Sequence, residues 1–197
     1  MEIKMKLLSD TIFGNGMSIP GGEDISVLCD GNGFPYYKGS TFKGIFREEL
    51  ECYLDWILEE VDNKQKRIEE EITRLLGKSG DDEIKNASKL VFSDFQLSNS
   101  VKECVLQEIG LGKKNVVLNS VSHTRTFNSL SEDGVSKKGA LRNCRCVNKG
   151  LCFYSEIQCS EADVPMVQEI LSNIKWIGTM RNRGFGKVKI TIRKGED

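Results

Sequence analysis

The sequence holds no run of about 18 apolar residues, so no membrane-spanning helix and no membrane partner are expected. Residues 1–10 alternate charged and apolar side chains and lack the apolar stretch of a signal peptide, so we expect a cytoplasmic protein. The GxxxxGK(S/T) loop that holds nucleotide phosphates is also missing, which argues against a nucleoside triphosphatase. The remaining composition, 39% hydrophobic and 29% charged, is ordinary for a soluble globular chain.

The seven cysteines include no CxxC pair, and there is one histidine. One interpretation is a set of reduced, partly buried thiols. The alternative is a zinc site built on Cys144 and Cys146, with Cys104, Cys152 or His123 completing a tetrahedral shell, although the C-x-C spacing is not that of a zinc knuckle. His123 also has two interpretations, as a structural residue or as the general base of a metal-independent ribonuclease.

The net charge of −1 hides a strong separation of charge along the chain. Residues 48–83 carry thirteen acidic and five basic side chains, whereas residues 84–197 carry eleven acidic and eighteen basic ones. Residues 175–194 hold seven bases and no acid, and residues 111–153 hold eight bases against two acids. One surface should therefore attract polyanions while another repels them.

Hydrophobic periodicity predicts an α+β protein with one domain spanning residues 1–197. Stripped of insertions at 9–39, 62–86 and 99–149, the order is strand, helix, strand, strand, helix, strand, which is the βαββαβ pattern of a modified RRM or ferredoxin-like fold. The expected elements of this pattern are strands at 3–8, 87–98, 151–159 and 186–194 and helices at 40–61 and 160–178.

The insertions carry further expected structure. A charged helix is predicted at 64–77, ended by Gly77, and Ser40 is the predicted N-cap of the 40–61 helix. Residues 99–149 read as short β-like pieces, in which "VVLNSV" pairs with "SHTRTF" and a hairpin tip forms around Asp133 and Gly134.

Two glycine-containing motifs have the character of phosphate sites. In "YYKGSTFKGIFRE", Gly39 and Ser40 precede a helix whose first N–H groups can bind an anion, and Lys43 and Arg47 share one helix face. In "MRNRGFGKVKI", the Gly-Phe-Gly turn can wrap a phosphate while its aromatic ring stacks on a base. The bases around that turn are Arg181, Arg183 and Lys187. The simpler interpretations are a capped helix with solvated bases and a basic surface turn.

The stretch "IPGGEDISVLCDGNG" places Asp24 and Asp30 in a glycine-rich loop. A carboxylate beside a phosphodiester can orient a 2′-hydroxyl, take its proton or hold a divalent cation. From the residues alone, ordinary turn chemistry is the favoured interpretation, because Asp and Gly favour loops.

Together, "GGEDISVLCD", "PYYKGSTFKGIFRE", "FSDFQL" and "RNRGFGKV" resemble the RAMP superfamily of CRISPR-associated proteins, and most closely the repeated backbone subunit of type III CRISPR effector complexes. The resemblance covers nearly the whole chain. It implies an RRM-like fold whose copies or paralogues stack as a filament along a guide RNA, with other effector subunits and target RNA as partners. A thumb-like β-hairpin would wedge into the guide–target duplex, and a first-loop aspartate would cut target RNA with a divalent cation, for which we expect magnesium.

The resemblance assigns Asp24 as the catalytic aspartate, with Asp30 as the weaker candidate. It assigns guide-phosphate contacts to Gly39, Ser40, Lys43 and Arg47, and the family's glycine loop to Gly184, Phe185 and Gly186. It places the thumb at the basic segment 120–145, with Arg125, Lys137, Lys138 and Arg142. Together with Arg181, Arg183 and Lys187 around the glycine loop, these are the predicted RNA-binding residues. Two departures from the family pattern are the Lys38-Gly39-Ser40 sequence, where Pro-Gly-Ser is common, and the acidic helix at 64–77.

Four interpretations remain open from the sequence. The chain is either a guide-holding subunit that cuts target RNA, or one that only holds guide RNA. It is alternatively a stand-alone endoribonuclease that processes repeat transcripts, in which His123 would matter and metal would not. The last alternative is a non-catalytic module whose basic surface meets acidic protein partners.

Overall fold

The computed structural model describes residues 1–193 except 15, 17–21, 60, 79–89, 129–130, 132 and 136–138. Its main sheet contains β1 (Glu2–Leu7), β6 (Cys152–Gln158), β7 (Val188–Arg193) and the short strands β2 (Val91–Phe92) and β3 (Gln96–Leu97). The order is β2-β6-β1-β7, with β3 also paired to β6, and every pairing is antiparallel. The first and last segments of the chain therefore lie side by side as β1 and β7.

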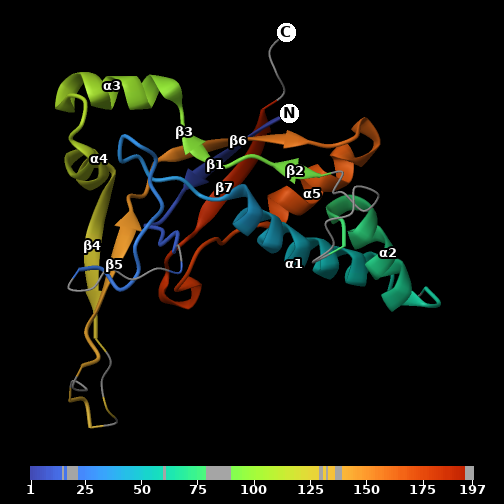
Figure 1. Ribbon diagram of the computed structural model, residues 1–197. Coiled ribbons are helices and arrows are strands. Elements are labelled where there is room, and N and C mark those ends of the chain that lie inside the picture. Colours follow the sequence, from blue (N-terminus) through green and yellow to red (C-terminus); the bar gives the residue numbers. More distant parts are fainter. Residues whose placement is uncertain are drawn as a thin grey trace.

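Helices α1 (Gly39–Ile57) and α5 (Val164–Asn173) cover one face of this sheet, and α2 (Lys64–Leu76) packs against α1 (Figure 1). The strands alternate, so that Ile3, Met5 and Leu7 of β1 are fully buried toward the helices. Phe42 and Phe46 of α1 pack on Phe92, and this aromatic contact seats α1 on the β2 edge of the sheet. In the described part of the chain, no helix covers the opposite face of the sheet along β1 and β7 (Figure 1).

A second module stands at the other end of the molecule (Figure 1). Helices α3 (Asn99–Ile109) and α4 (Lys114–Val121) lead into a separate two-stranded antiparallel sheet of β4 (Ser122–Phe127) and β5 (Arg142–Val147). This hairpin extends away from the main sheet, and Gly134 (φ 76°) lies in the turn at its tip, where its amide donates to the Ser131 carbonyl at 3.0 Å.

The α+β prediction is confirmed, and the strands expected at 3–8, 151–159 and 186–194 are found within a few residues. The helix expected at 64–77 is also confirmed, with Gly77 as its C-cap. Within the described residues, no helix is long and apolar enough to cross a bilayer.

Other predictions about the elements are wrong. "VVLNSV" belongs to α4 instead of a strand, and the partner of "SHTRTF" is β5. The strand expected at 87–98 is broken at residues 93–95 into β2 and β3, and residues 87–89 lie outside the described part. The helix expected at 160–178 is ordered as an α-helix only over Val164–Asn173, because Trp176 bridges to Lys187 instead. Ser40 is not the N-cap, since α1 already includes Gly39 and its N-cap is Lys38.

The docking of α2 on the α5 end of the molecule depends on one arginine. Arg74 donates two hydrogen bonds to Glu71 and two to Asp163, at 2.7 and 3.2 Å for the latter, and Asp163 closes the 3-10 turn η2 (Glu161–Asp163) that precedes α5. Asp163 is nearly buried while Arg74 remains 37% exposed. The contact is therefore partly screened by solvent.

We expect Arg74→Met to lower the free energy of unfolding by about 1–2 kcal/mol, because Asp163 loses charge-assisted hydrogen bonds. Urea denaturation followed by circular dichroism measures the change. Arg67→Met on the exposed face of the same helix is the matched control. Equal losses for the two variants would contradict a specific clamp between Arg74 and Asp163.

Candidate nucleic-acid interface

Asp24 is exposed and lies beside the start of β5, at the end of the paired strands nearer the hairpin tip. The Asp24 amide donates to the Asn143 carbonyl at 2.8 Å, and the Asn143 amide donates to Oδ2 of Asp24 at 2.6 Å. Ile25 continues this pairing, since the Arg145 amide donates to its carbonyl at 2.9 Å and it bridges to Cys144. The loop segment therefore adds to the edge of β5, and the Asp24 carboxylate is held in place by backbone.

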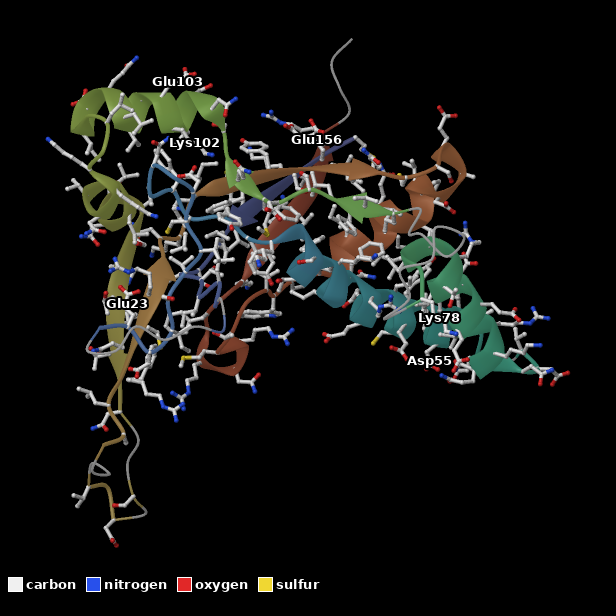
Figure 2. All side chains as sticks on the ribbon, viewed as in Figure 1. Glu23, Asp55, Lys78, Lys102, Glu103 and Glu156 are labelled. Carbon is white, nitrogen blue, oxygen red and sulfur yellow. The ribbon has the colours of Figure 1, made fainter. Side chains whose placement is uncertain are left out.

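A nearly buried ion pair anchors this loop. Arg145 donates from Nε to Oε1 of Glu23 at 2.6 Å, and its Nη1 donates to Oδ1 of Asn119 at 2.6 Å. Figure 2 shows Glu23 beside the base of the hairpin. The Arg145 guanidinium bonds both the Glu23 carboxylate and the Asn119 side-chain amide. These bonds fix Glu23, the residue directly before Asp24. Neither Glu23 nor Arg145 was singled out from the sequence, because their contact spans more than a hundred residues.

Asp30 is differently occupied. Its Oδ1 accepts hydrogen bonds from the amides of Asn32 and Phe34, both at 3.0 Å, and its Oδ2 pairs with Nζ of Lys102 at 3.1 Å. This is the pattern of a carboxylate that shapes its own turn. Of the two predicted aspartates, Asp24 is thus the one with an exposed carboxylate, and Asp30 has a structural explanation.

Basic residues from three separate segments meet at the inner end of the hairpin. They surround a hollow of about 230 Å³, which we call the hairpin-base cavity. Arg125 comes from β4, Lys149 from the turn between β5 and β6, and Arg183 from the 3-10 turn η3 (Arg181–Arg183). The full lining is Leu8, Ser9, Asp10, Arg125, Lys149, Arg183, Gly184 and Phe185. Three cations against one carboxylate make this cavity attractive to an anion.

Lys149 was missed by the sequence analysis, although it lies in the segment that holds eight bases against two acids. The Lys149 amide donates to Oδ1 of Asp10 at 3.0 Å, which fixes this turn against the end of β1. Asp10 is also 3.7 Å from Nε2 of His123, whose Nδ1 is 2.7 Å from Oδ1 of Asn148.

The glycine loop behaves differently from its prediction. Phe185 is 5% exposed, packs edge-on against Phe127 with ring centroids 5.6 Å apart, and lies 5.4 Å from the guanidinium carbon of Arg125. Its ring is therefore unavailable to stack on a base, and it supports Arg125 instead. Both glycines have positive φ, but a Cβ on Gly186 would lie 1.9 Å from the Ile177 carbonyl oxygen, whereas Gly184 faces open space.

The start of α1 also differs from its prediction. The Gly39 amide donates to Oδ1 of Asp94 at 2.9 Å, so a protein carboxylate takes the position that was expected for a phosphate. A Cβ on Gly39 would lie 2.3 Å from the Phe92 carbonyl oxygen, so close packing against the sheet explains this glycine. Ser40 is exposed.

The two predicted bases of α1 are half-buried. Arg47 donates from Nη2 to the Gly77 carbonyl at 3.3 Å, at the C-terminal end of α2. Burial, with a smaller effect of Arg47, lowers the pKa of Lys43 below its ordinary value. Arg47 therefore lies on the flank of α1 that faces α2.

Tyr37, directly before α1, connects this helix to the segment that carries η3. Burial raises the pKa of Tyr37 to about 12, while the Gly178 backbone and the charge of Arg181 act in the opposite direction. Its neighbours line a hollow of about 280 Å³. Arg181 thus lies near the start of α1, while Arg183 and Gly184 belong to the hairpin-base cavity.

Arg142 lies at the start of β5, opposite Phe127. The Lys187 backbone is hydrogen-bonded to Leu8 and Ser9 beside the cavity, but its Nζ lies 5.9 Å from the Trp176 ring centroid. Lys137 and Lys138 are outside the described residues.

The predicted zinc ligands are spread over the second module and the main sheet. Cys144 and Cys146 are buried with Ile12 and Phe185, and burial raises the pKa of Cys146 to about 11, which favours the thiol over the thiolate. Cys104 is exposed on α3 and Cys152 begins β6. Over the described ranges, no three His, Cys, Asp or Glu side chains are grouped so that they could hold a metal ion.

A family model described as "RAMP superfamily" matches residues 4–189. No curated protein sequence matches the chain. Two similar solved chains come from complexes described as "Type III-B Cmr-beta Cryo-EM structure of the Apo state" and "Cryo-EM structure of the Type III-B Cmr-beta bound to cognate target RNA". Both are 15% identical and align over 96% of this chain and 95% of the other, with TM-scores of 0.65 and 0.64. At this identity the likeness establishes a shared fold.

Proposed function

Because this chain belongs to the RAMP superfamily, we propose that it is a guide-RNA-binding subunit of a type III CRISPR effector complex and that Asp24 cuts the paired target RNA. The observation that carries the proposal is that Asp24 and Arg125, one of the three cations of the hairpin-base cavity, lie on opposite edges of the same strand, β5. Asp24 and Ile25 pair with one edge of β5, and Arg125 lies across the other edge, opposite Cys144. Two strand spacings separate these backbones, roughly 10 Å.

In this proposal the strands β1, β2 with β3, β6 and β7, with helices α1 and α5, are the βαββαβ core of a single RRM-like domain over residues 1–197. The β4–β5 hairpin is the thumb. Cytoplasmic copies or paralogues would stack along the guide as a filament with other effector subunits. One of the two similar solved complexes is bound to cognate target RNA, which supports an RNA partner for this chain.

The chemistry assigned to Asp24 is proton transfer. Its carboxylate would accept the proton of the target's 2′-hydroxyl, whose oxygen attacks the adjacent phosphorus while the 5′-oxygen leaves. Arg125, Lys149 and Arg183 would fix neighbouring phosphates so that the attack is in line. A divalent cation, for which we expect magnesium, would be held by Asp24 together with RNA phosphate oxygens and would stabilise the developing charge.

The cations of the hairpin base lead to a binding prediction. We expect Arg125→Gln with Arg183→Gln to weaken binding of single-stranded RNA about tenfold, equally for unrelated sequences. The slope of log affinity against log salt should fall by about 1.4, since each phosphate contact contributes about 0.7. Fluorescence anisotropy at several salt concentrations measures both quantities.

Lys66→Gln with Arg67→Gln on α2 removes the same charge and is the control. The pair Lys43→Gln and Arg47→Gln tests in the same assay the guide contacts that the family pattern assigns to α1. Loss of affinity for one RNA sequence only would contradict backbone binding. Purified protein that carries no RNA and binds none would favour the protein-interaction alternative.

His123 supports a second candidate function, since its ring lies between Asp10 and Asn148 at the edge of the cationic cavity. Cleavage by the isolated chain that persists in EDTA and is lost in His123→Gln would identify a stand-alone, metal-independent ribonuclease.

A further inference from the structure

The face of the main sheet that points away from α1 and α5 carries a cluster of lysines. Lys4 and Lys6 of β1 alternate with the buried residues Ile3 and Met5, so their side chains lie on the free face. Lys189 of β7 is directly opposite Lys6 in the antiparallel register. Lys6 and Lys189 are exposed and Lys4 is half-buried. These three residues are called the sheet lysines below.

The arrangement of the sheet lysines is unfavourable by itself. Like charges that face each other across two strands destabilise the pair. Within the described ranges, none of the three takes part in an ion pair, whereas Glu2 and Arg193, farther along the same two strands, pair at 3.5 Å. An anionic ligand would relieve this repulsion.

The sheet lysines continue the hairpin-base cavity. Leu8 follows Lys6 by two residues along β1, and Leu8 and Ser9 line that cavity together with Arg125 and Lys149. The distance from Leu8 to Lys4 is about 13 Å of extended chain. Beyond Asp10, the one carboxylate of the hairpin-base cavity, basic side chains therefore extend across the free face as far as Lys4. Tyr154 of β6, half-buried and opposite Lys4, lies at the far end.

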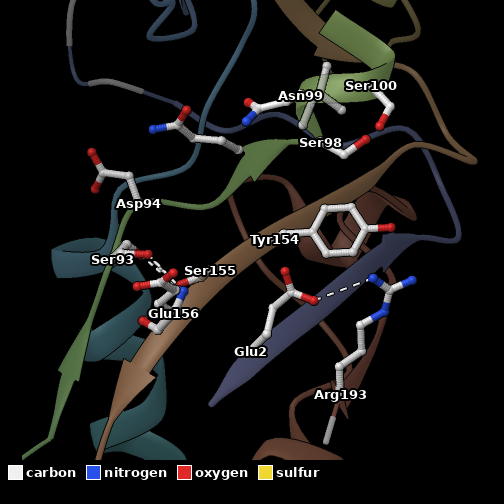
Figure 3. A pocket seen from close by; sticks show the side chains of 12 residues that line it. Glu2, Ser93, Asp94, Ser98, Asn99, Ser100, Tyr154, Ser155, Glu156 and Arg193 are labelled. Atoms are coloured by element: carbon white, nitrogen blue, oxygen red, sulfur yellow. Dashed lines mark hydrogen bonds and ion pairs between the residues drawn. The ribbon is translucent and has the colours of Figure 1, made fainter. Parts of the chain in front are cut away.

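Beyond Tyr154 the character of the face changes. A hollow of about 510 Å³ there is bordered by the carboxylates of Glu2, Asp94 and Glu156, and Arg193 lies 5.2 Å from the Tyr154 ring (Figure 3). Three carboxylates against one guanidinium repel a phosphate chain. This acidic end limits the basic surface, formed by the hairpin-base cavity and the sheet lysines, to the segment between the cavity and Tyr154.

We propose that the sheet lysines form a second RNA-binding surface, which holds the backbone of single-stranded RNA as it leaves the hairpin-base cavity. The surface uses the RNA partner of the proposed function but does not depend on cleavage by Asp24. RNA fits better than an acidic protein, because the core of a protein interface is depleted of lysine and other charged residues. The free-face positions of β1, β6 and β7 are mostly charged or polar, with Tyr154 as their one aromatic residue: Glu2, Lys4, Lys6, Cys152, Tyr154, Glu156, Gln158, Lys189, Thr191 and Arg193.

The test compares short and long RNA. The full chain with Lys4→Gln, Lys6→Gln and Lys189→Gln is titrated with two labelled single-stranded RNAs of mixed sequence. The long RNA can cover both the hairpin-base cavity and the sheet lysines, and the short RNA can cover only the cavity. We expect affinity for the long RNA to fall about tenfold and its salt slope by about 2, with little change for the short RNA. The melting temperature should stay equal or rise, because the lysine repulsion is removed.

The matched control is Lys66→Gln, Arg67→Gln and Lys78→Gln, an equal change of charge on and beside α2, where Figure 2 shows Lys78. Equal affinity of the sheet-lysine variant and this control for the long RNA would overturn the proposal. The proposal would also be overturned if the sheet-lysine variant keeps RNA binding but no longer binds an acidic protein partner. If Arg125→Gln with Arg183→Gln weakens RNA binding and the sheet-lysine variant does not, only the proposed surface of sheet lysines is refuted. If neither variant changes binding, the proposed function fails as well.

Discussion

Replacing Asp24 with asparagine is expected to slow target RNA cleavage by about 10²- to 10⁴-fold while guide and target binding stay unchanged. Asparagine has the same shape and keeps an oxygen to accept the hydrogen bond from the Asn143 amide, now 2.6 Å from Oδ2. It cannot accept the 2′-hydroxyl proton, and it holds a divalent cation poorly. The measurement is the single-turnover cutting rate of labelled complementary RNA by reconstituted complex with magnesium.

Asp30→Asn separates chemistry from loop structure. Asp30 loses its charge opposite Lys102 but keeps acceptors for Asn32 and Phe34, so we expect a small loss of stability without a selective loss of cutting. Undiminished cutting by Asp24→Asn refutes the assignment of Asp24. A wild-type complex that binds target and never cuts it identifies the purely structural subunit.

The sequence carried the outline of the fold because the strands at both ends and the helix at 64–77 have clear periodicity. The prediction of secondary structure from the sequence failed over residues 99–149 for a physical reason. In α3 the apolar residues Val101, Val105 and Ile109 recur at helical spacing, but they stand among polar residues and none is fully buried. α4 is a short helix rich in valine, which is typical of strands. Only the contacts with the rest of the chain decide these elements.

Local chemistry pointed to the basic η3 turn, and the family resemblance pointed to Asp24, which the structure shows to be exposed. Contacts with distant residues could not be predicted. Gly39 resembled the opening of an anion site, but the carboxylate that binds its amide belongs to Asp94, 55 residues away. The Phe185 ring is buried against Phe127, which no spacing in the sequence reveals.

The two glycines of the terminal loop should respond very differently to alanine. Gly186 is wedged between two segments, since its amide donates to the Asp10 carbonyl at 3.0 Å and its carbonyl accepts from the Ile177 amide at 2.9 Å. An added Cβ would lie 1.9 Å from the Ile177 carbonyl oxygen, at a φ of +79°. We expect Gly186→Ala to lower the free energy of unfolding by more than about 4 kcal/mol, because backbone must move apart.

Gly184→Ala is the informative partner of that variant. Gly184 also has a positive φ, +85°, but its Cβ would meet nothing within 4 Å, so only strain of about 1–2 kcal/mol is expected. If the open space beside Gly184 admits an RNA backbone, the added methyl group weakens RNA binding while the protein stays folded. Urea denaturation and RNA anisotropy on the same samples measure both effects. A Gly184→Ala variant with wild-type affinity would show that this glycine serves only the turn, and that Arg125, Lys149 and Arg183 bind phosphate without close approach of the loop backbone.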